Sequence, residues 1–199
     1  MTVRHRNTLS QDYFEELYAA SNDPWNFSAS DYERQKYEAT LAAIGTGHRR
    51  ALEIGCSIGV FTRLLAERCA RLVAVDIADG ALRQARRRCA DQPHVEFRRL
   101  ALPGAMPSGQ FKVVVLSEVG DYWTLSDLDR FAGWLAGALT ACGLCTLVHW
   151  TGETDFPLTG DQVHDRILDL TRGSLEPRQH FQNQHYRLDV LVKPVGVAA

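Results

Sequence analysis

The sequence predicts an α/β protein with a doubly wound and mostly parallel sheet. After residue 48, short runs of Val, Leu and Ile alternate with segments whose apolar residues recur at helical spacing. Continuous apolar runs are typical of strands buried on both faces of a parallel sheet, and repeated strand–helix units connect through right-handed crossovers. With 45% hydrophobic and 23% charged residues, the 199-residue chain can form one sizeable core. We therefore expect one domain over residues 1–199, and not a disordered, collagenous or coiled-coil chain.

The elements of the expected core, residues 48–199, follow in order along the chain. The apolar run at residues 51–54 ends at Gly55, and the run at 72–75 is closed by Asp76. A strand that contains Pro177 and a strand at residues 186–192 are close enough to pair as a C-terminal β-hairpin. The remaining pattern predicts strands at 95–97, 113–116 and 145–150, and helices at 61–69, 78–90, 127–141 and about 161–172.

The first 47 residues predict a helical N-terminal cap. Residues 10–20 have aromatic and aliphatic side chains four positions apart, as in an amphipathic helix that ends at the break around Pro24. A second helix is expected over residues 31–44, capped by Ser30 or Asp31 and ended by the glycines that follow it.

Charge gives no indication of a nucleic-acid partner. The formal net charge is −2, so no global field draws the chain to nucleic acid or to an anionic membrane. Four arginines fall on the predicted helix at 78–90, but no aromatic residues are interleaved with them. We interpret Arg83, Arg86, Arg87 and Arg88 as a solvated helix face and expect no nucleic-acid partner.

Cysteine usage and the polar start of the chain favour a cytoplasmic protein with free thiols. The number of cysteines is odd, at five, and the first residues carry no secretory pattern. Cys142 and Cys145 form a CxxC without a second ligand pair, so we expect packing and no metal. Residues 131–151 lack charged side chains over a length that could span a bilayer, but we expect them to divide at Gly143 into a helix end and a buried strand. No membrane partner is expected.

The strongest motif lies between the first predicted strand and the helix after it. It reads Glu53-Ile-Gly55-Cys56-Ser57-Ile-Gly59, in which the glycines allow a tight turn and a close approach to a ligand. Asp76 closes the second strand 17 residues after Gly59, where a carboxylate can accept hydrogen bonds from both hydroxyls of a ribose.

The second acid, Glu53, argues against a dinucleotide. A pyrophosphate at the glycine turn would face this carboxylate and be repelled by about 4 kcal/mol at an effective dielectric near 20. S-adenosylmethionine (SAM) instead has a ribose, an α-ammonium and a sulfonium, and no phosphate. The charge pattern therefore favours SAM over NAD or ATP.

The motif of Glu53, Gly55 and Gly59 with Asp76 resembles the signature of class I SAM-dependent methyltransferases. Over roughly the first 150 residues the chain is also similar to a narrower group, the nodulation protein S (NodS) family. This likeness depends on Asp23-Pro24-Trp25, Tyr32-Glu33-Arg34 to Tyr37, Leu52 to Cys56, Ser117-Glu118-Val119 with Tyr122, and His149-Trp150.

The resemblance implies a seven-stranded Rossmann-like sheet, SAM as methyl donor, S-adenosylhomocysteine (SAH) as product, and methylation of an amino group. In the nodulation family the acceptor is a de-N-acetylated chitooligosaccharide. An acid that many relatives carry after the third strand is missing here, so we expect a backbone N–H of Ala101 or Leu102 to hold the adenine. The expected cofactor-binding residues are Glu53, Gly55, Cys56, Ser57, Gly59, Asp76, Ile77, Ala101, Leu102, Ser117, Trp25 and Arg34.

Candidate catalytic residues follow the ends of strands, because ligands of open α/β sheets bind there. Glu118 and Tyr122 follow the fourth strand, and His149 ends the fifth. A neutral amine needs only positioning and a group that takes its proton, a role open to His149 or Glu118. Two alternatives stay open: His149 with Trp150 as a structural pair, and Glu118 as a ligand for a substrate hydroxyl or ammonium.

The N-terminal segment has a predicted role at the same edge of the sheet. Trp25 and Phe27 could fold over the strand ends as a lid that excludes water, and Arg34 could pair with the methionine carboxylate of SAM. The alternative is that these aromatic residues pack the cap helices onto the core.

We expect N-methylation of a small amino sugar or of its oligosaccharide, with a small-molecule or oligosaccharide acceptor as partner. The alternatives are O-methylation of another small metabolite and, in a different class, a SAM- or nucleotide-binding module without turnover. The sequence does not indicate an oligomeric state.

Overall fold

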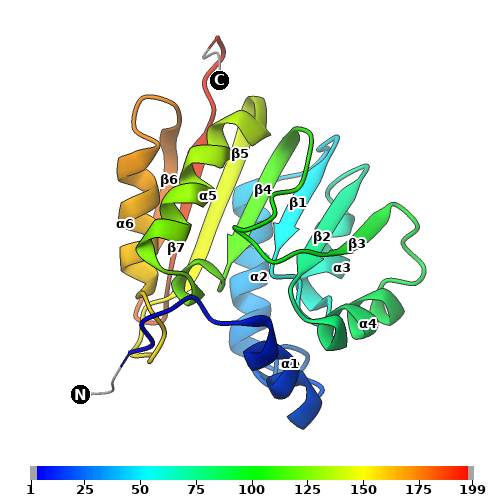
Figure 1. Cartoon of the computed structure of the whole chain (residues 1–199). Coiled ribbons are helices and arrows are strands. Elements are labelled where there is room, and N and C mark those ends of the chain that lie inside the picture. Colours follow the sequence, from blue (N-terminus) through cyan, green and yellow to red (C-terminus); the bar gives the residue numbers. More distant parts are fainter. Residues whose placement is uncertain (1–3, 197–199) are drawn as a thin grey trace.

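The computed structural model describes residues 4–196 and confirms the predicted α/β fold (Figure 1). The cap contains α1 (Gln11–Ala20) and α2 (Asp31–Ile44). The parallel part comprises β1 (Ala51–Ile54), α3 (Val60–Ala66), β2 (Leu72–Asp76), α4 (Asp79–Arg88), β3 (Val95–Arg99), β4 (Phe111–Ser117), the 3-10 turn η1 (Gly120–Tyr122), α5 (Leu125–Ala138) and β5 (Leu139–Trp150). It is followed by α6 (Gly160–Leu170), β6 (Glu176–Gln182) and β7 (Tyr186–Val192).

The sheet has seven strands in the order β3-β2-β1-β4-β5-β7-β6. The first five strands in this order are parallel, with Ile54 opposite Val75 on one side and Leu116 on the other. β7 is antiparallel to both β5 and β6, which confirms the C-terminal hairpin. Because β1, β2, β4 and β5 run in one direction, their carboxyl ends meet at one edge of the sheet.

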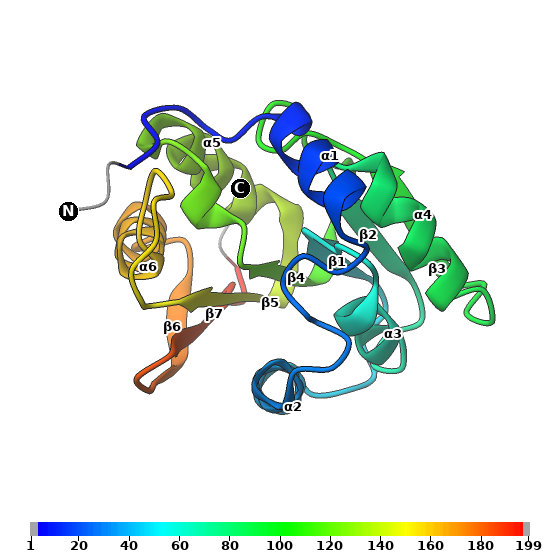
Figure 2. The ribbon, with the colours of Figure 1, turned by 90° about the horizontal axis from the view of Figure 1, so that it is seen from below.

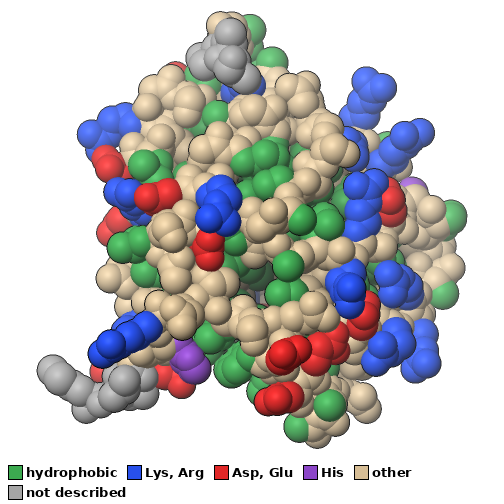
Figure 3. All heavy atoms as spheres, viewed as in Figure 1, with side chains coloured by type: hydrophobic (Ala, Val, Ile, Leu, Met, Phe, Trp, Pro, Cys, Tyr) green, Lys and Arg blue, Asp and Glu red, His purple; other side chains and the backbone are tan. Residues whose placement is uncertain are grey.

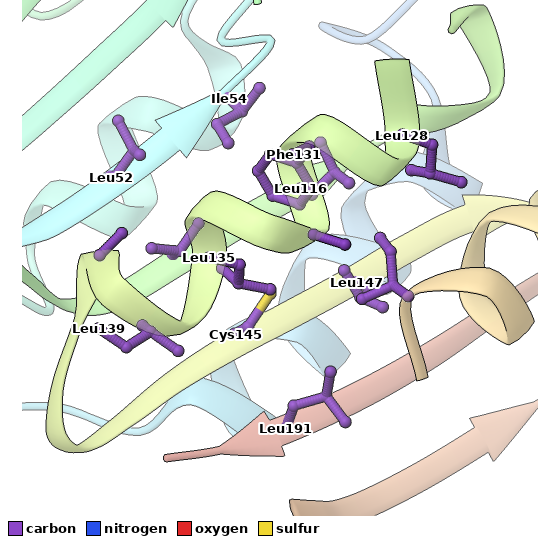
Figure 4. Packing of buried hydrophobic residues seen from close by; sticks show 14 of the residues in the cluster. Leu52, Ile54, Leu116, Leu128, Phe131, Leu135, Leu139, Cys145, Leu147 and Leu191 are labelled. Atoms are coloured by element: carbon purple, nitrogen blue, oxygen red, sulfur yellow. The ribbon is translucent and has the colours of Figure 1, made fainter. Parts of the chain in front are cut away.

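Helices cover both faces of the sheet. Figure 2 shows α2 and α3 on one side and α5 and α6 on the other. On the α5 side, Leu52, Ile54 and Leu116 pack against Phe131 and the other apolar side chains of that helix (Figure 4). On the opposite face, Ala51, Val113 and Val115 pack against α2 and α3. Burial on both faces explains why the parallel strands are continuous apolar runs.

The boundary between α5 and β5 differs from the one expected at Gly143. The helix ends at Ala138, and the extended backbone begins at Leu139, which pairs with Phe111. The ladder then shifts, with Cys142 at a positive φ of 54°, and regular pairing resumes at Leu144. Leu139 and Cys145 are fully buried in the main core, as expected for a core stretch. Among residues 4–196 no helix is long and apolar enough to cross a membrane.

The arginine-rich face of α4 is exposed to solvent. All four arginines of this face are exposed, as predicted, and Figure 3 shows Lys and Arg side chains over α4 and β3. The neighbouring arginines of β3 form ion pairs, Arg99 with Asp79 and Arg98 with Glu96.

Candidate active site

A cavity lies at the edge where the carboxyl ends of the parallel strands meet. It encloses about 1000 Å³ of empty space, its open mouth included. Its walls come from the ends of β1, β2 and β4 and from the N-terminal cap. Figure 1 shows α1 at this edge, below the ends of β1 and β4. This is the position in which open α/β sheets bind their ligands.

At two glycines of the motif, a residue with a side chain would not fit. Gly55 has φ +78°, and a Cβ there would lie 2.2 Å from Cγ2 of Val119. Gly59 has φ +81°, and a Cβ there would lie 2.8 Å from the Cα of Ala85 in α4. The first glycine lets the backbone turn beneath the cavity, and the second lets α3 begin close against α4.

Asp76 is held at the end of β2 with both oxygens bonded to the backbone. Oδ2 accepts from the amide of Ser57 at 2.8 Å, and Oδ1 accepts from the amide of Ala78 at 2.9 Å. Each carboxylate oxygen has a further lone pair, so two vicinal hydroxyls can still donate to this side chain. Burial raises the pKa of Asp76 to about 6, so the side chain is largely ionised at neutral pH.

Glu53 presents a buried carboxyl group to the same cavity. Its residue is 3% exposed, and its Oε2 has no hydrogen-bond partner among the described residues. Burial raises the pKa of Glu53 to about 8. An unpartnered buried acid is unfavourable unless a ligand completes it, and a primary ammonium would do so.

Aromatic residues of the cap close the other side of the cavity. The rings of Trp25 and Phe27 stack with centroids 5.6 Å apart, and both line the cavity. The Tyr18 hydroxyl of α1 makes a hydrogen bond with Oγ of Ser57 in the glycine turn. The same rings pack in a cluster with Ile58. These aromatic residues therefore cover the cavity and pack on the core, so that both predicted roles are compatible with their positions.

The cavity collects most of the residues proposed from the sequence. Gly59 and Ala101 stand beside lining residues in the chain, and Gly59 caps α3. The proposed residues that line it directly are Trp25, Glu53, Gly55, Cys56, Ser57, Asp76, Ile77, Leu102, Ser117, Glu118 and Tyr122.

Arg34 does not reach the cavity, which corrects the expectation that it pairs with a carboxylate there. Its exposed guanidinium pairs with Asp31 at 3.0 Å and Glu38 at 3.1 Å on the outer face of α2. The inner face of the helix is instead formed by Glu33, Lys36 and positions one turn further on.

His149 is also placed differently from its expected catalytic role. The residue is fully buried, and its Nε2 accepts from the amide of Gly120 at 3.1 Å. Its Nδ1 lies 3.1 Å from Nε2 of His164, whose Nδ1 lies 2.6 Å from Asp189. Burial lowers the pKa of both histidines, so they are neutral and form a hydrogen-bonded chain. The structure thus supports the alternative of a structural role for His149.

Glu118 follows β4 with a positive φ of 54°, an uncommon conformation that is concentrated at functional sites. Its Oε2 accepts from the amide of Trp150 at 2.9 Å, and its Oε1 accepts from Nζ of Lys36 at 2.6 Å. Lys36 donates also to Glu33 at 2.9 Å. Neither Lys36 nor Glu33 was predicted from the sequence to lie at the cavity, although they are three residues apart on the apolar stripe of α2.

The sheet order, the glycine turn and its two acids are the fold and site of class I SAM-dependent methyltransferases, whose cofactor is SAM. Solved structures share this fold. N-methyltransferase NodS from Bradyrhizobium japonicum WM9, in complex with SAH, aligns with a TM-score of 0.80 and 20% identity, covering 92% of this chain and 98% of that chain. A proposed methyltransferase from Pseudomonas syringae aligns with a TM-score of 0.71 and 34% identity, covering 81% and 99%.

The narrower family follows from the sequence match. The family described as nodulation protein S (NodS) matches residues 9–140, and the chain belongs to this family. Nodulation protein S from Bradyrhizobium diazoefficiens is 32% identical over 102 residues, which are 50% of this chain and 49% of that protein. The matched segment thus spans about half the length of the curated relatives.

Proposed function

We propose that this protein transfers a methyl group from SAM to the amino group of a small amino sugar or a de-N-acetylated oligosaccharide. The observation that carries the proposal is the charge of the cavity wall. Four carboxyl groups line it, from Glu33, Glu53, Asp76 and Glu118, and its described lining holds no Lys or Arg. Lys36 behind the wall balances one of these charges, and the wall stays acidic. Such a wall attracts a donor with a sulfonium and an ammonium, and it attracts an acceptor amine as well.

The residues present fit the donor group by group. The two hydroxyls of the ribose would donate to Asp76, and the α-ammonium would complete the unpartnered Oε2 of Glu53. The adenine would lie among Ile77, Leu100 and Leu102, which line the cavity beyond Asp76. When bound, SAM supplies an activated methyl group whose transfer is an in-line displacement.

What the chain itself contributes to this reaction is position and the exclusion of water. Placing an amine nitrogen at attack distance from the methyl group can provide up to about 7–11 kcal/mol in favourable cases. Trp25, Phe27 and Phe14 surround the cavity with apolar surface and would keep water from the reacting atoms.

An aromatic cluster beside the acids favours a carbohydrate acceptor. The rings of Trp150 and His185 stack with centroids 5.5 Å apart, and Tyr32 lies edge-on to both. The Trp150 amide donates a hydrogen bond to Glu118, so this cluster adjoins the end of the cavity that Glu118 lines. Aromatic rings offer the flat apolar faces on which sugar rings pack. N-methyltransferase NodS, whose fold the chain shares, supports an amine as acceptor.

A first prediction concerns the proton that the protein releases when SAM binds. Because the pKa of Glu53 is about 8 without ligand, its side chain is mostly protonated at pH 7. An ammonium beside it favours the carboxylate, so SAM binding at pH 7 is expected to release close to one proton. Affinity should therefore rise between pH 6 and pH 8. Calorimetry in buffers of different ionisation enthalpy measures this release, and Glu53→Gln should remove it; proton uptake by the wild type would contradict the assignment.

The function itself is tested with SAM and a panel of acceptors. Glucosamine and de-N-acetylated chitooligosaccharides are compared with their N-acetylated counterparts and with hydroxyl acceptors, and NMR locates the new methyl group. We expect SAH formation and an N-methyl product only with free amines. A methyl ether would indicate O-methylation, and SAM binding without SAH formation across the panel would indicate a binding module. Uptake of NAD or ATP in preference to SAM would contradict the whole assignment.

A further inference from the structure

A cluster of three charged residues lies against the part of the cavity that Glu33 and Glu118 line. Lys36 projects from α2 between the carboxylates of Glu33 and Glu118, at 2.9 Å and 2.6 Å. Its side chain is 2% exposed, and that of Glu33 is 10% exposed. Ions buried to this degree are costly to the fold, and titratable groups in such surroundings cluster at functional sites.

The four carboxylate oxygens of this cluster are not equally occupied. Lys36 donates hydrogen bonds to Oε1 of Glu33 and to Oε1 of Glu118, and the Trp150 amide donates to the second oxygen of Glu118. Oε2 of Glu33 is the one oxygen of the cluster without a hydrogen-bond partner among the described residues. Glu33 also lines the cavity. This oxygen is itself buried, so a donor that comes from the cavity reaches it when the Glu33 carboxylate turns toward the cavity that the residue lines.

We propose, on the basis of the amine methylation proposed above, that Glu33 takes the proton of the acceptor amine and that Lys36 is the residue that positions it. The acceptor enters as an ammonium and donates to Oε2 of Glu33. The proton passes to this oxygen, and the neutral amine then attacks the methyl carbon. The new N–C bond forms as the S–C bond breaks, its electron pair stays on sulfur, and Glu33 returns its proton to solvent.

The surroundings of Glu33 suit this step. Burial raises the pKa of Glu33, which strengthens it as a base, whereas the neighbouring Lys36 ammonium and the Tyr37 hydroxyl act to lower the pKa. The negative charge of Glu118, in the neighbouring loop, acts to raise the pKa of Glu33. Glu118 also lines the cavity, but each of its oxygens already accepts one hydrogen bond, and the neutral His149 is buried away from the cavity lining. Of Glu33 and Glu118, only Glu33 has an oxygen that accepts no hydrogen bond among the described residues.

The test compares Glu33→Gln with Glu38→Gln, a matched change at an exposed acid of the same helix. We expect Glu33→Gln to bind SAH within about twofold of the wild type but to lose about 10²–10⁴ in kcat with an amino-sugar acceptor at neutral pH. Because a neutral amine needs no base, the loss should shrink as the pH rises above the pKa of the amine. Glu38→Gln should keep the wild-type kcat and pH profile.

A structural role would give a loss that is constant with pH, and this result would overturn the proposal. A wild-type kcat in Glu33→Gln would overturn it as well. Glu33→Asp, which keeps a carboxylate, should recover part of the activity at neutral pH, and failure of this rescue in a folded variant that binds SAH counts against the proposal. A wild-type protein that methylates only hydroxyls would refute the proposed function itself, and the role of Glu33 toward an amine with it; the wild-type product distinguishes the two failures.

Discussion

Replacing Asp76 by alanine is expected to weaken SAH binding roughly 100-fold. Two hydrogen bonds to a charged acceptor contribute about 1.5–3 kcal/mol each, and a loss of about 3 kcal/mol is a factor of 100. The substitution also frees the amides of Ser57 and Ala78, which Asp76 holds at 2.8 Å and 2.9 Å. The glycine turn would then lose the bond that sets its position beneath the proposed ribose site. Calorimetric titration with SAH measures the effect directly.

Asp79→Ala is the matched control for this change. Asp79 lies three residues further along the chain and pairs with Arg99 at the surface, 2.9 Å away, so we expect its loss to leave SAH affinity unchanged. The pH dependence gives a second check. Since the pKa of Asp76 is about 6, wild-type affinity should fall as the pH decreases through 6, and Asp76→Ala should show less of this fall. Equal affinities for Asp76→Ala and wild type would contradict the ribose assignment.

Most of the fold could be predicted because burial on both faces imposes a simple pattern. Val73 and Val75 face the α5 side of the sheet, and Leu72 and Ala74 face the other, so no position of this strand tolerates a polar residue before Asp76. The end of α5 could not be predicted in the same way. Leu139 is apolar and buried whether it continues the helix or begins the strand, so hydrophobic periodicity does not distinguish the two.

The cofactor end of the site was equally visible in the sequence, because backbone geometry dictates it. Gly55 and Gly59 are required by positive φ and close contacts, and Asp76 must follow its strand to reach the same edge. Each of these constraints acts on residues that are close together in the sequence, and each requires a particular residue type that can be recognised there.

The proposed acceptor site, formed around Glu33 and Lys36, depends on which face of α2 turns inward. Arg34 and Lys36 are two residues apart and therefore point to different sides of a helix. Tyr37, Leu41 and Ile44 mark the buried stripe, and one turn back this stripe passes through Glu33 and Lys36. That extrapolation was available from the sequence. The pairing of Lys36 with Glu118 was not, because the two residues are 82 positions apart.

His149→Ala is expected to lower the free energy of unfolding by about 3–5 kcal/mol. The change leaves a cavity in the core and removes the acceptor of the Gly120 amide and the partner of His164. SAH affinity should change much less than in Asp76→Ala, because His149 does not contact the predicted ribose position. Urea denaturation and SAH titration of the two variants should therefore rank them in opposite orders.

Two further substitutions separate the bonds that His149 makes. Glutamine can place an oxygen near the position of Nε2 and accept from Gly120, whereas asparagine reaches only as far as Nδ1, on the side of His164. If the bond to Gly120 holds the turn that carries Glu118 and Tyr122, His149→Gln should retain more methyl transfer than His149→Asn at equal stability.

Burial lowers the pKa of His149 and His164, so the unfolded chain binds protons at a higher pH than the folded chain does. Wild-type stability should therefore decrease as the pH falls below about 6.5. His149→Gln should weaken this dependence. A variant as stable as the wild type, with intact SAH binding and no methyl transfer, would instead restore His149 as a catalytic residue.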